Sequence, residues 1–355
     1  MRLLPMIAAA SMLTCAASAQ ADDEQRISGP YTHQNLSIYF VHGKSAPGPV
    51  PLTLQEALQK DAVEVIETQS VNELKVRNKG DTGIYIQSGD IVKGGQQDRV
   101  ITVSFVLPPN SGEVPLASFC VEQGRWSQRG DENVAQFSSS AEALPSREAK
   151  LAMKAPIAAA PQTEGGNTGM EQQVAGGGDQ TGERQTKVWE EVSKTQTKLA
   201  GGLNSSVQSD ESASSLQLSL ENEDLQQKRT DYIQALQEHG AEKDDIIGYV
   251  FAINGKLNSA DLYPSNALFR KMWEKLLTAS VTEAIGESGD PTSATIAPPD
   301  TAAVETFLAD AEKGKSSSQD IEGLAKQDVR DAERSLFVGV QSSDGQWIHR
   351  NYLIK

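Results

Sequence analysis

The sequence contains little cysteine, few aromatic residues and no long apolar run after its first twenty residues. Its 355 residues include two cysteines, and aromatic residues make up 5% of the chain. A helix needs about 20 consecutive apolar residues to cross a membrane, so we expect no membrane insertion by the remainder of the chain. The low aromatic content and the polar middle predict an ordered core smaller than the length suggests.

The N-terminal segment has the pattern of a secretory signal peptide. Arg2 precedes an apolar run that ends near Leu13, and small residues follow as far as Ala19. A basic start, a short apolar core and an Ala-x-Ala site are typical of a leader that is removed on export. Residues 1–19 are therefore predicted to be a signal peptide, cleaved after Ala19 or, almost equally well, after Ala21. The expected location is periplasmic or secreted.

The cysteine content excludes a disulfide-stabilised fold. Cys15 lies in the predicted leader, which leaves Cys120 without an intrachain partner in the mature chain. Phe119 and Val121 flank Cys120 with apolar side chains, and no histidine or lysine lies close in sequence to activate the thiol. We therefore predict a buried, unreactive thiol rather than a nucleophile. The fold must then depend on its hydrophobic core.

The chain is strongly acidic. Its formal net charge is −16, and loss of Arg2, the one charged residue of the leader, changes −16 to −17. Such a surface repels the phosphates of nucleic acids and the headgroups of anionic lipids, so neither is expected as a partner. A site for an anion would need basic side chains gathered locally, which directs attention to Arg99 and Arg125.

Short β-branched segments separated by turns dominate the first third of the sequence. They run from Leu36 to Trp126, and strands of this length and spacing are typical of a mainly antiparallel sheet or sandwich. One short helix interrupts them, because Thr53 followed three residues later by Glu56 forms a capping box. Residues 28–150 are therefore predicted to be mainly β structure.

The rest of the sequence alternates between flexible and helical patterns. A segment rich in glycine and small residues, 151–183, is predicted to be a flexible insert, and 184–355 to contain helices and β hairpins. Helices are expected over 185–199, 222–239, 266–285 and 301–311, and a strand over 246–253 followed by an Asn-Gly turn and a polar loop. The turn at Asp344 and Gly345 marks a C-terminal hairpin that should pair with an existing sheet. These features predict a single α+β domain over 28–355.

Several enzyme signatures are missing from the sequence. It contains no G-x-S-x-G nucleophile elbow, no H-E-x-x-H and no C-x-x-C. The four histidines show no metal-ligand spacing, and the Gly-Lys-Ser of residues 43–45 lacks the earlier glycine of a phosphate-binding loop. We therefore predict neither a metal site nor a cofactor.

Two polar stretches lie directly beside strands and are the candidates for a site. GDIVKGGQQDRV (89–100) and CVEQGRW (120–126) put acids, amides and an arginine against β-branched or aromatic residues. The adjacent glycines permit a backbone nest whose amide groups can hold an anion, and the two arginines could add bidentate charge. The ring of Trp126 could stack on a ligand. The candidate ligand-binding residues are Gly94, Gly95, Gln96, Gln97, Arg99, Arg125 and Trp126.

The same two stretches contain acids that could take part in chemistry. Asp90 and Glu122 are the candidates for a catalytic acid or base. The structural alternative is that both stretches are turns, whose arginine and acid side chains form internal ion pairs across strand ends. The two interpretations differ in whether these charges face a ligand or one another.

Taken together, the motifs resemble the ARG and rhodanese-phosphatase-superfamily-associated protein domain. GDIVKGGQQDRV and CVEQGRW are joined by KVWEEV (187–192) and by LYPSNALFRKMWEKLL (262–277), and the similarity spans roughly 36–285 apart from the Gly-rich insert. The family is named for its gene neighbours, ADP-ribosyl glycohydrolases and rhodanese or phosphatase-like proteins, and the resemblance implies no established activity. It implies an association with ADP-ribose or phosphate metabolism, which would suit an anion site at Arg99 and Arg125. The predicted export departs from that mainly intracellular metabolism.

Two functions from different classes follow from these observations. The first is an exported binding module that recognises a small anionic ligand or a protein partner without catalysis. The second is a hydrolase acting on a nucleotide, ADP-ribose-type or phosphoester substrate. In the second, the two arginines act as electrophilic clamps and Asp90 or Glu122 acts as acid or base. A structure that encloses these four side chains in ion pairs would count against the hydrolase.

Overall fold

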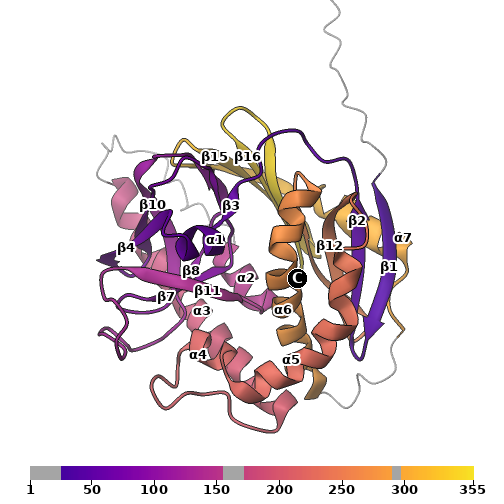
Figure 1. The fold of residues 1–355 in the computed structure, drawn as a ribbon, viewed down its shortest axis with the longest axis horizontal. Coiled ribbons are helices and arrows are strands. Elements are labelled where there is room, and N and C mark those ends of the chain that lie inside the picture. Colours follow the sequence, from indigo (N-terminus) through magenta and orange to yellow (C-terminus); the bar gives the residue numbers. More distant parts are fainter. Residues whose placement is uncertain (1–24, 155–171, 290–296) are drawn as a thin grey trace, which may run out of the picture.

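Two large antiparallel sheets with a long helix between them form the body of the protein in a computed structural model (Figure 1). The structure describes residues 25–154, 172–289 and 297–355. The predicted signal peptide with both of its cleavage positions, and the larger part of the predicted insert, lie outside these ranges. Within them no helix is both long and apolar enough to cross a membrane.

The larger sheet takes strands from both ends of the described chain. Its order is β1-β2-β12-β13-β17-β16-β15-β14, with antiparallel neighbours throughout. The strands are β1 (Arg26–His33), β2 (Leu36–His42), β12 (Ile246–Ile253), β13 (Lys256–Leu262), β14 (Lys315–Ile321), β15 (Ala325–Asp331), β16 (Ser335–Ser342) and β17 (Trp347–Ile354). The predicted α+β class and the predicted C-terminal hairpin, formed by β16 and β17, are confirmed.

Strand β2 shows why this sheet is covered on both faces. All seven of its residues are buried, and successive side chains of a strand point to opposite faces. Ile38 and Phe40 belong to the main core with helix α6 (Asn266–Gly286), whereas Tyr39 and Val41 belong to a second core with Val304 of helix α7 (Thr301–Ala311). The two helices therefore cover opposite faces, so the strand reads as a continuous apolar run rather than an alternating one.

The second large sheet has six strands in the order β11-β7-β8-β10-β5-β4. It curls until its two edge strands meet, at an isolated bridge between Ile66 and Gln136. The strands are β4 (Val63–Ser70), β5 (Glu73–Asn78), β7 (Asp90–Gly94), β8 (Arg99–Ile101), β10 (Gly112–Cys120) and β11 (Phe137–Ala143). A third sheet contains β3 (Leu52–Thr53), β6 (Ile84–Ile86) and β9 (Phe105–Leu107). The line along which the edges of β4 and β11 face each other is called the seam below.

The helices lie around and between the sheets, and α6 occupies the centre of the molecule (Figure 1). They are α1 (Leu54–Gln59), α2 (Arg147–Lys154), α3 (Gln172–Leu203), α4 (Leu216–Leu220), α5 (Glu223–Leu236), α6 (Asn266–Gly286) and α7 (Thr301–Ala311), with single 3-10 turns at Gln237–Gly240 and Glu287–Gly289. The predicted capping box is present at the start of α1, where Thr53 and Glu56 exchange side-chain and backbone hydrogen bonds.

Two sequence expectations about these elements are wrong. The helix expected from residue 185 begins at Gln172, because a packed helix extends one hydrogen bond at a time and needs no second nucleation. The expected polar loop after the Asn-Gly turn is strand β13, which is largely buried. Its Asn258 and Asp261 are tolerated inside because Asn258 donates to Glu283 at 2.9 Å and Asp261 accepts from Asn351 at 2.9 Å.

Candidate functional site

The two polar stretches singled out in the sequence meet in a buried group of acids and arginines. We call Asp98, Glu122, Arg125 and Arg129 the acid–arginine cluster. Arg129 contacts both carboxylate oxygens of Asp98, at 2.8 and 2.9 Å, and Arg125 Nε lies 2.7 Å from Glu122 Oε2. Both acids are fully buried, with an exposed fraction of 0%. Their charges are therefore neutralised within the protein.

Arg99 is also turned inward. Its side chain is completely buried, with Nη2 3.5 Å from Glu67 Oε2, and Nη1 donates to the Gln97 carbonyl at 3.1 Å. Gln97 in turn donates to the Glu122 carbonyl at 2.7 Å. Trp126 is the exposed member of the set: 46% of it is accessible, and its ring covers the Arg99 guanidinium at 5.7 Å. The structure thus places the predicted ligand-binding arginines in the internal ion pairs that the sequence left open as the alternative.

The second candidate acid, Asp90, lies in a separate buried pair. Its Oδ1 is 3.0 Å from Lys275 Nζ on α6, and its Oδ2 accepts from the Gln87 amide at 3.0 Å. Glu122 is held by arginines, so the two candidate acids belong to different ion pairs. Neither presents an open carboxylate to solvent, since 3% of Asp90 and 0% of Glu122 is exposed.

Sequence reasoning missed Arg129, although it is the central cation of the cluster. Its Nη1 also lies 3.3 Å from Glu122 Oε1, and its Nη2 donates to Glu132 at 2.8 Å. Burial lowers the pKa of Arg129, but hydrogen bonds and charge from Asp98 outweigh it and raise that pKa above its usual value. The only sequence signal for Arg129 was its position three residues before Glu132 in a turn, and such a spacing is too common to indicate a buried cluster.

A serine, a histidine and an aspartate from distant parts of the chain also meet, a second feature that the sequence did not indicate. Ser104 Oγ lies 3.2 Å from His349 Nδ1, and His349 Nε2 lies 2.9 Å from Asp261 Oδ1. These are the residue types of a hydrolytic triad, but 1%, 2% and 4% of the three residues is exposed. Ser104 Oγ also accepts from the Ser88 amide at 2.9 Å. The arrangement therefore joins the link between β8 and β9 to the eight-stranded sheet in the interior.

This buried histidine predicts a pH dependence of stability. Burial lowers the pKa of His349 below 6.5, although Asp261 and Asp90 raise it and Lys154 adds to the lowering. The unfolded chain then takes up a proton near pH 6.5 that the folded protein refuses, so stability is complete above that pH and falls as the pH is lowered through it. The expected slope is at most about 1.4 kcal/mol per pH unit.

Urea unfolding of the wild type and of His349→Gln at pH 7, 6 and 5 measures this slope. Glutamine can keep one donor and one acceptor but does not titrate. The stability advantage of the wild type is therefore expected to shrink as the pH falls. Equal slopes for the two proteins would rule out His349 as the titrating group. Burial raises the pKa of Asp261, but the hydrogen bond from His349 outweighs burial and lowers that pKa below 3.8. The stability that the Asp261 carboxylate contributes is therefore lost only below pH 3.8, outside the range of this measurement.

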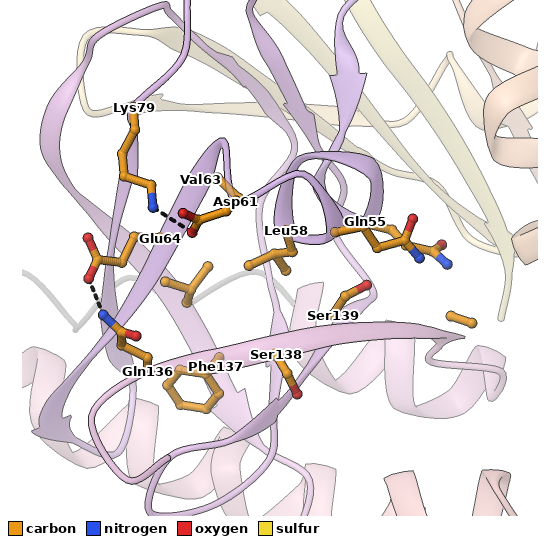
Figure 2. A pocket seen from close by; sticks show the side chains of 13 residues that line it. Gln55, Leu58, Asp61, Val63, Glu64, Lys79, Gln136, Phe137, Ser138 and Ser139 are labelled. Atoms are coloured by element: carbon orange, nitrogen blue, oxygen red, sulfur yellow. Dashed lines mark hydrogen bonds and ion pairs between the residues drawn. The ribbon is translucent and has the colours of Figure 1, made fainter. Parts of the chain in front are cut away.

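A groove of about 520 Å³ opens at the seam (Figure 2). Residues of α1, β4 and β11 line it. Apolar side chains line its depth and polar ones its rim; they include Leu58, Val63, Val65 and Phe137, and Glu64, Lys79, Ser138 and Ser139. At one end Lys79 binds Asp61 at 2.6 Å, and the Gln136 side chain donates to Glu64. This is a hollow of the size that ligand sites have.

The polar stretch at residues 94–98 closes the other end of the seam. Glu67 of β4 donates its amide to the Ala135 carbonyl at 3.0 Å, and its carboxylate accepts from the Gln96 amide at 3.2 Å. Gly94 pairs with Phe137, and the amide of Gly95 donates to the Asn133 carbonyl at 3.1 Å. The predicted glycines therefore lie behind the wall of the groove.

Gly95→Ala is expected to destabilise the protein by about 1–3 kcal/mol. Gly95 has φ +56°, and a Cβ there would overlap the Phe137 ring and lie 2.9 Å from Glu67 Oε2. Denaturant unfolding measures the effect, with Gly124→Ala as the matched control. Gly124 has φ +89° but no atom within 4 Å of an added Cβ. If both changes cost the same, backbone strain rather than contact with the seam is the cause.

Cys120 lies close to this region and is buried, as predicted. Its Sγ contacts the Val71 carbonyl at 3.5 Å, and burial raises the pKa of the thiol to about 12. Its backbone exchanges hydrogen bonds of 2.8 and 2.9 Å with the side chain of Gln185, which anchors α3 to β10. Across the described ranges, no three His, Cys, Asp or Glu side chains are grouped to hold a metal ion.

Comparison with known proteins gives one relationship. Residues 24–353 match the ARG and Rhodanese-Phosphatase-superfamily-associated Protein domain, which is nearly the whole chain and more than the motifs alone had suggested. No curated protein and no solved structure gives a significant match.

Proposed function

The chain belongs to the ARG and Rhodanese-Phosphatase-superfamily-associated Protein domain family, and we propose that it is an exported binding protein whose seam groove takes a ligand without chemical turnover. The observation that carries this proposal is the groove itself. Its volume of about 520 Å³ lies within the range of about 300–1,000 Å³ typical of ligand sites. It combines an apolar depth with a polar rim, which is the usual chemistry of recognition.

The state of the candidate acids and arginines supports binding over hydrolysis. A general acid or base must reach a substrate atom, and an electrophilic arginine must face developing charge. Glu122, Arg99 and Arg125 are instead bound within the acid–arginine cluster or to Glu67, and Asp90 is bound to Lys275. The buried Ser104 hydroxyl has no more access than these groups.

The export part of the proposal is supported by the signal-peptide pattern of residues 1–19. Expression of the full chain with its leader, followed by mass determination of the protein outside the cytoplasm, tests this part. A mature chain beginning at Gln20 or Asp22 supports export, and a full-length protein confined to the cytoplasm contradicts it.

Thermal unfolding of the chain from Gln20 tests binding in the groove. The panel contains ADP-ribose, NAD, phosphate, sugars and short peptides, each with three proteins. Ser139→Trp fills the groove from β11, whereas Ser317→Trp makes the same change on an exposed position of β14. A ligand at 100 times its dissociation constant adds about 2.7 kcal/mol of stability. We expect a ligand of the groove to raise the unfolding midpoint of the wild type and of Ser317→Trp but not that of Ser139→Trp. Equal increases in all three proteins would place the ligand elsewhere.

The alternative, hydrolysis of a nucleotide, ADP-ribose-type or phosphoester substrate, is tested with the same protein. Turnover that disappears in Asp90→Asn or Glu122→Gln, while circular dichroism shows that both variants remain folded at the assay temperature, would overturn the proposal. Ser104→Ala serves as a third variant, because it removes the hydroxyl of the Ser104, His349 and Asp261 arrangement. No turnover in any of them is the expected result.

A further inference from the structure

The seam is an antiparallel ladder that starts and then stops. Its single bridge joins Ile66 to Gln136. The residue numbers of antiparallel partners rise on one strand as they fall on the other, so the next partners after Ile66 and Gln136 would include 64 with 138 and 63 with 139. Glu64, Ser138, Val63 and Ser139 instead line the groove. The hollow therefore occupies the place where this pairing would have continued.

We infer that the groove accepts an extended polypeptide segment of a partner protein, which inserts as a strand between the edges of β4 and β11. This inference rests on the proposed function and names its ligand class. Edge strands present unpaired backbone donors and acceptors, which is what strand addition uses for affinity. At this seam two such edges face one hollow, so an inserted strand would find backbone partners on both sides and complete the interrupted sheet.

The side chains of the groove indicate which segment fits. Alternate side chains of a strand point in opposite directions, so every second residue of the partner would face the depth formed by Leu58, Val65 and Phe137. Small β-branched residues suit these positions. The remaining side chains would face the rim and solvent.

Charge favours a neutral or basic partner. The charged residues of the lining are Asp61, Glu64 and Lys79, two acids and one base, for a sum of −1. Lys79 is already bound to Asp61 at 2.6 Å and Glu64 to Arg77 at 2.5 Å, so the lining itself is close to neutral. The chain as a whole carries −16, so an acidic segment would be repelled on approach.

The test uses fluorescein-labelled peptides of about six residues, a typical strand length, which alternate valine with lysine or threonine. Fluorescence anisotropy measures their binding to the wild type, to Ser139→Trp and to Ser317→Trp. Gln59→Trp, on an exposed groove-lining position of α1, is a second blocking variant in case Ser139→Trp folds poorly. Two further peptides carry either glutamate in place of lysine or N-methyl groups on alternate backbone amides.

Binding is expected to the wild type and to Ser317→Trp and to fall at least tenfold in both groove-filled variants. It should fall by a similar factor on N-methylation, because each methyl group removes a backbone donor, and on replacement of lysine by glutamate. Hydrogen exchange should slow at residues 63–65 and 138–141 in the complex. Binding that N-methylation leaves unchanged would overturn strand insertion.

Failure of the inference can be told apart from failure of the proposed function. If a sugar, nucleotide or phosphate raises the unfolding midpoint of the wild type but not that of Ser139→Trp, while no peptide binds, the groove is a ligand site and the polypeptide inference is wrong. If no compound and no peptide depends on the groove, both proposals fail. Light scattering covers a further outcome: dimerisation abolished by Ser139→Trp would make a second copy the occupant, in contradiction to a separate partner.

Discussion

Replacing Asp98 by alanine is expected to lower the free energy of unfolding by about 3–5 kcal/mol, since removal of one partner leaves buried charge uncompensated. Asp98 accepts from Arg129 at 2.8 and 2.9 Å, from Ser215 at 2.9 Å and from the Gly94 amide at 3.0 Å. It thereby joins β7, the loop that contains Arg129 and the start of α4. Loss of the carboxylate leaves two buried arginines with one fewer acid.

Guanidinium or urea unfolding of the wild type, Asp98→Ala and Asp98→Asn measures this cost. Asparagine retains some hydrogen bonds but not the charge, so Asp98→Asn should lie between the other two. Asp210→Ala is the control, because Asp210 is exposed and surface changes usually stay within about 0.5 kcal/mol. A loss in Asp98→Ala no greater than in the control would show that the cluster does not hold these segments together.

The buried pair of Arg229 and Glu142 gives the second large effect. Arg229 is 1% exposed, and its Nη1 donates to Glu142 at 2.9 Å and to the Leu220 carbonyl at 3.2 Å. Among the described residues its Nε and Nη2 have no hydrogen-bond partner. Burial lowers the pKa of Arg229, against the charge of Glu142. Arg229→Met leaves Glu142 buried and unpaired, which is expected to cost about 3–5 kcal/mol.

A double-mutant cycle tests the reason for this cost. Arg229→Met combined with Glu142→Leu replaces the whole pair with apolar side chains of similar size, and its stability should return to within about 1 kcal/mol of the wild type or exceed it. The coupling between the two positions would then be of opposite sign to the single losses. Additive losses in the double variant would mean that packing, rather than uncompensated charge, sets the cost.

Local patterns in the sequence predicted many of the regular elements well. Helix α7 has the predicted bounds, Thr301 to Ala311, and α6 begins at the predicted Asn266, with Ser265 as its side-chain cap. The hairpin turn at Gly345 and the capping box of α1 were equally legible. Each of these signals is confined to a few neighbouring residues, because caps, turns and apolar periodicity depend on local backbone geometry.

The acid–arginine cluster could be located from the sequence, but its contacts could not be predicted and the groove was not indicated at all. The sequence indicated the two polar stretches, yet Arg129 reaches Asp98 across 31 positions and Ser215 reaches it across 117. Strand β13 was missed for a related reason: Asp261 is polar but is satisfied by His349, 88 positions away. A polar residue in one sequence window carries no information about a partner that the fold supplies.

The amino-acid order alone therefore accounts for the α+β class, for most helix and strand positions and for the resemblance that the family match confirmed. Folding in three dimensions brought Arg99 against Glu67 and Arg125 against Glu122, and it created the groove where β4 and β11 approach and then separate. The physical reason is the distance along the chain over which each interaction acts. Backbone propensity acts over a few residues, whereas charge neutralisation and a gap between two sheet edges depend on segments that meet only after the chain has folded.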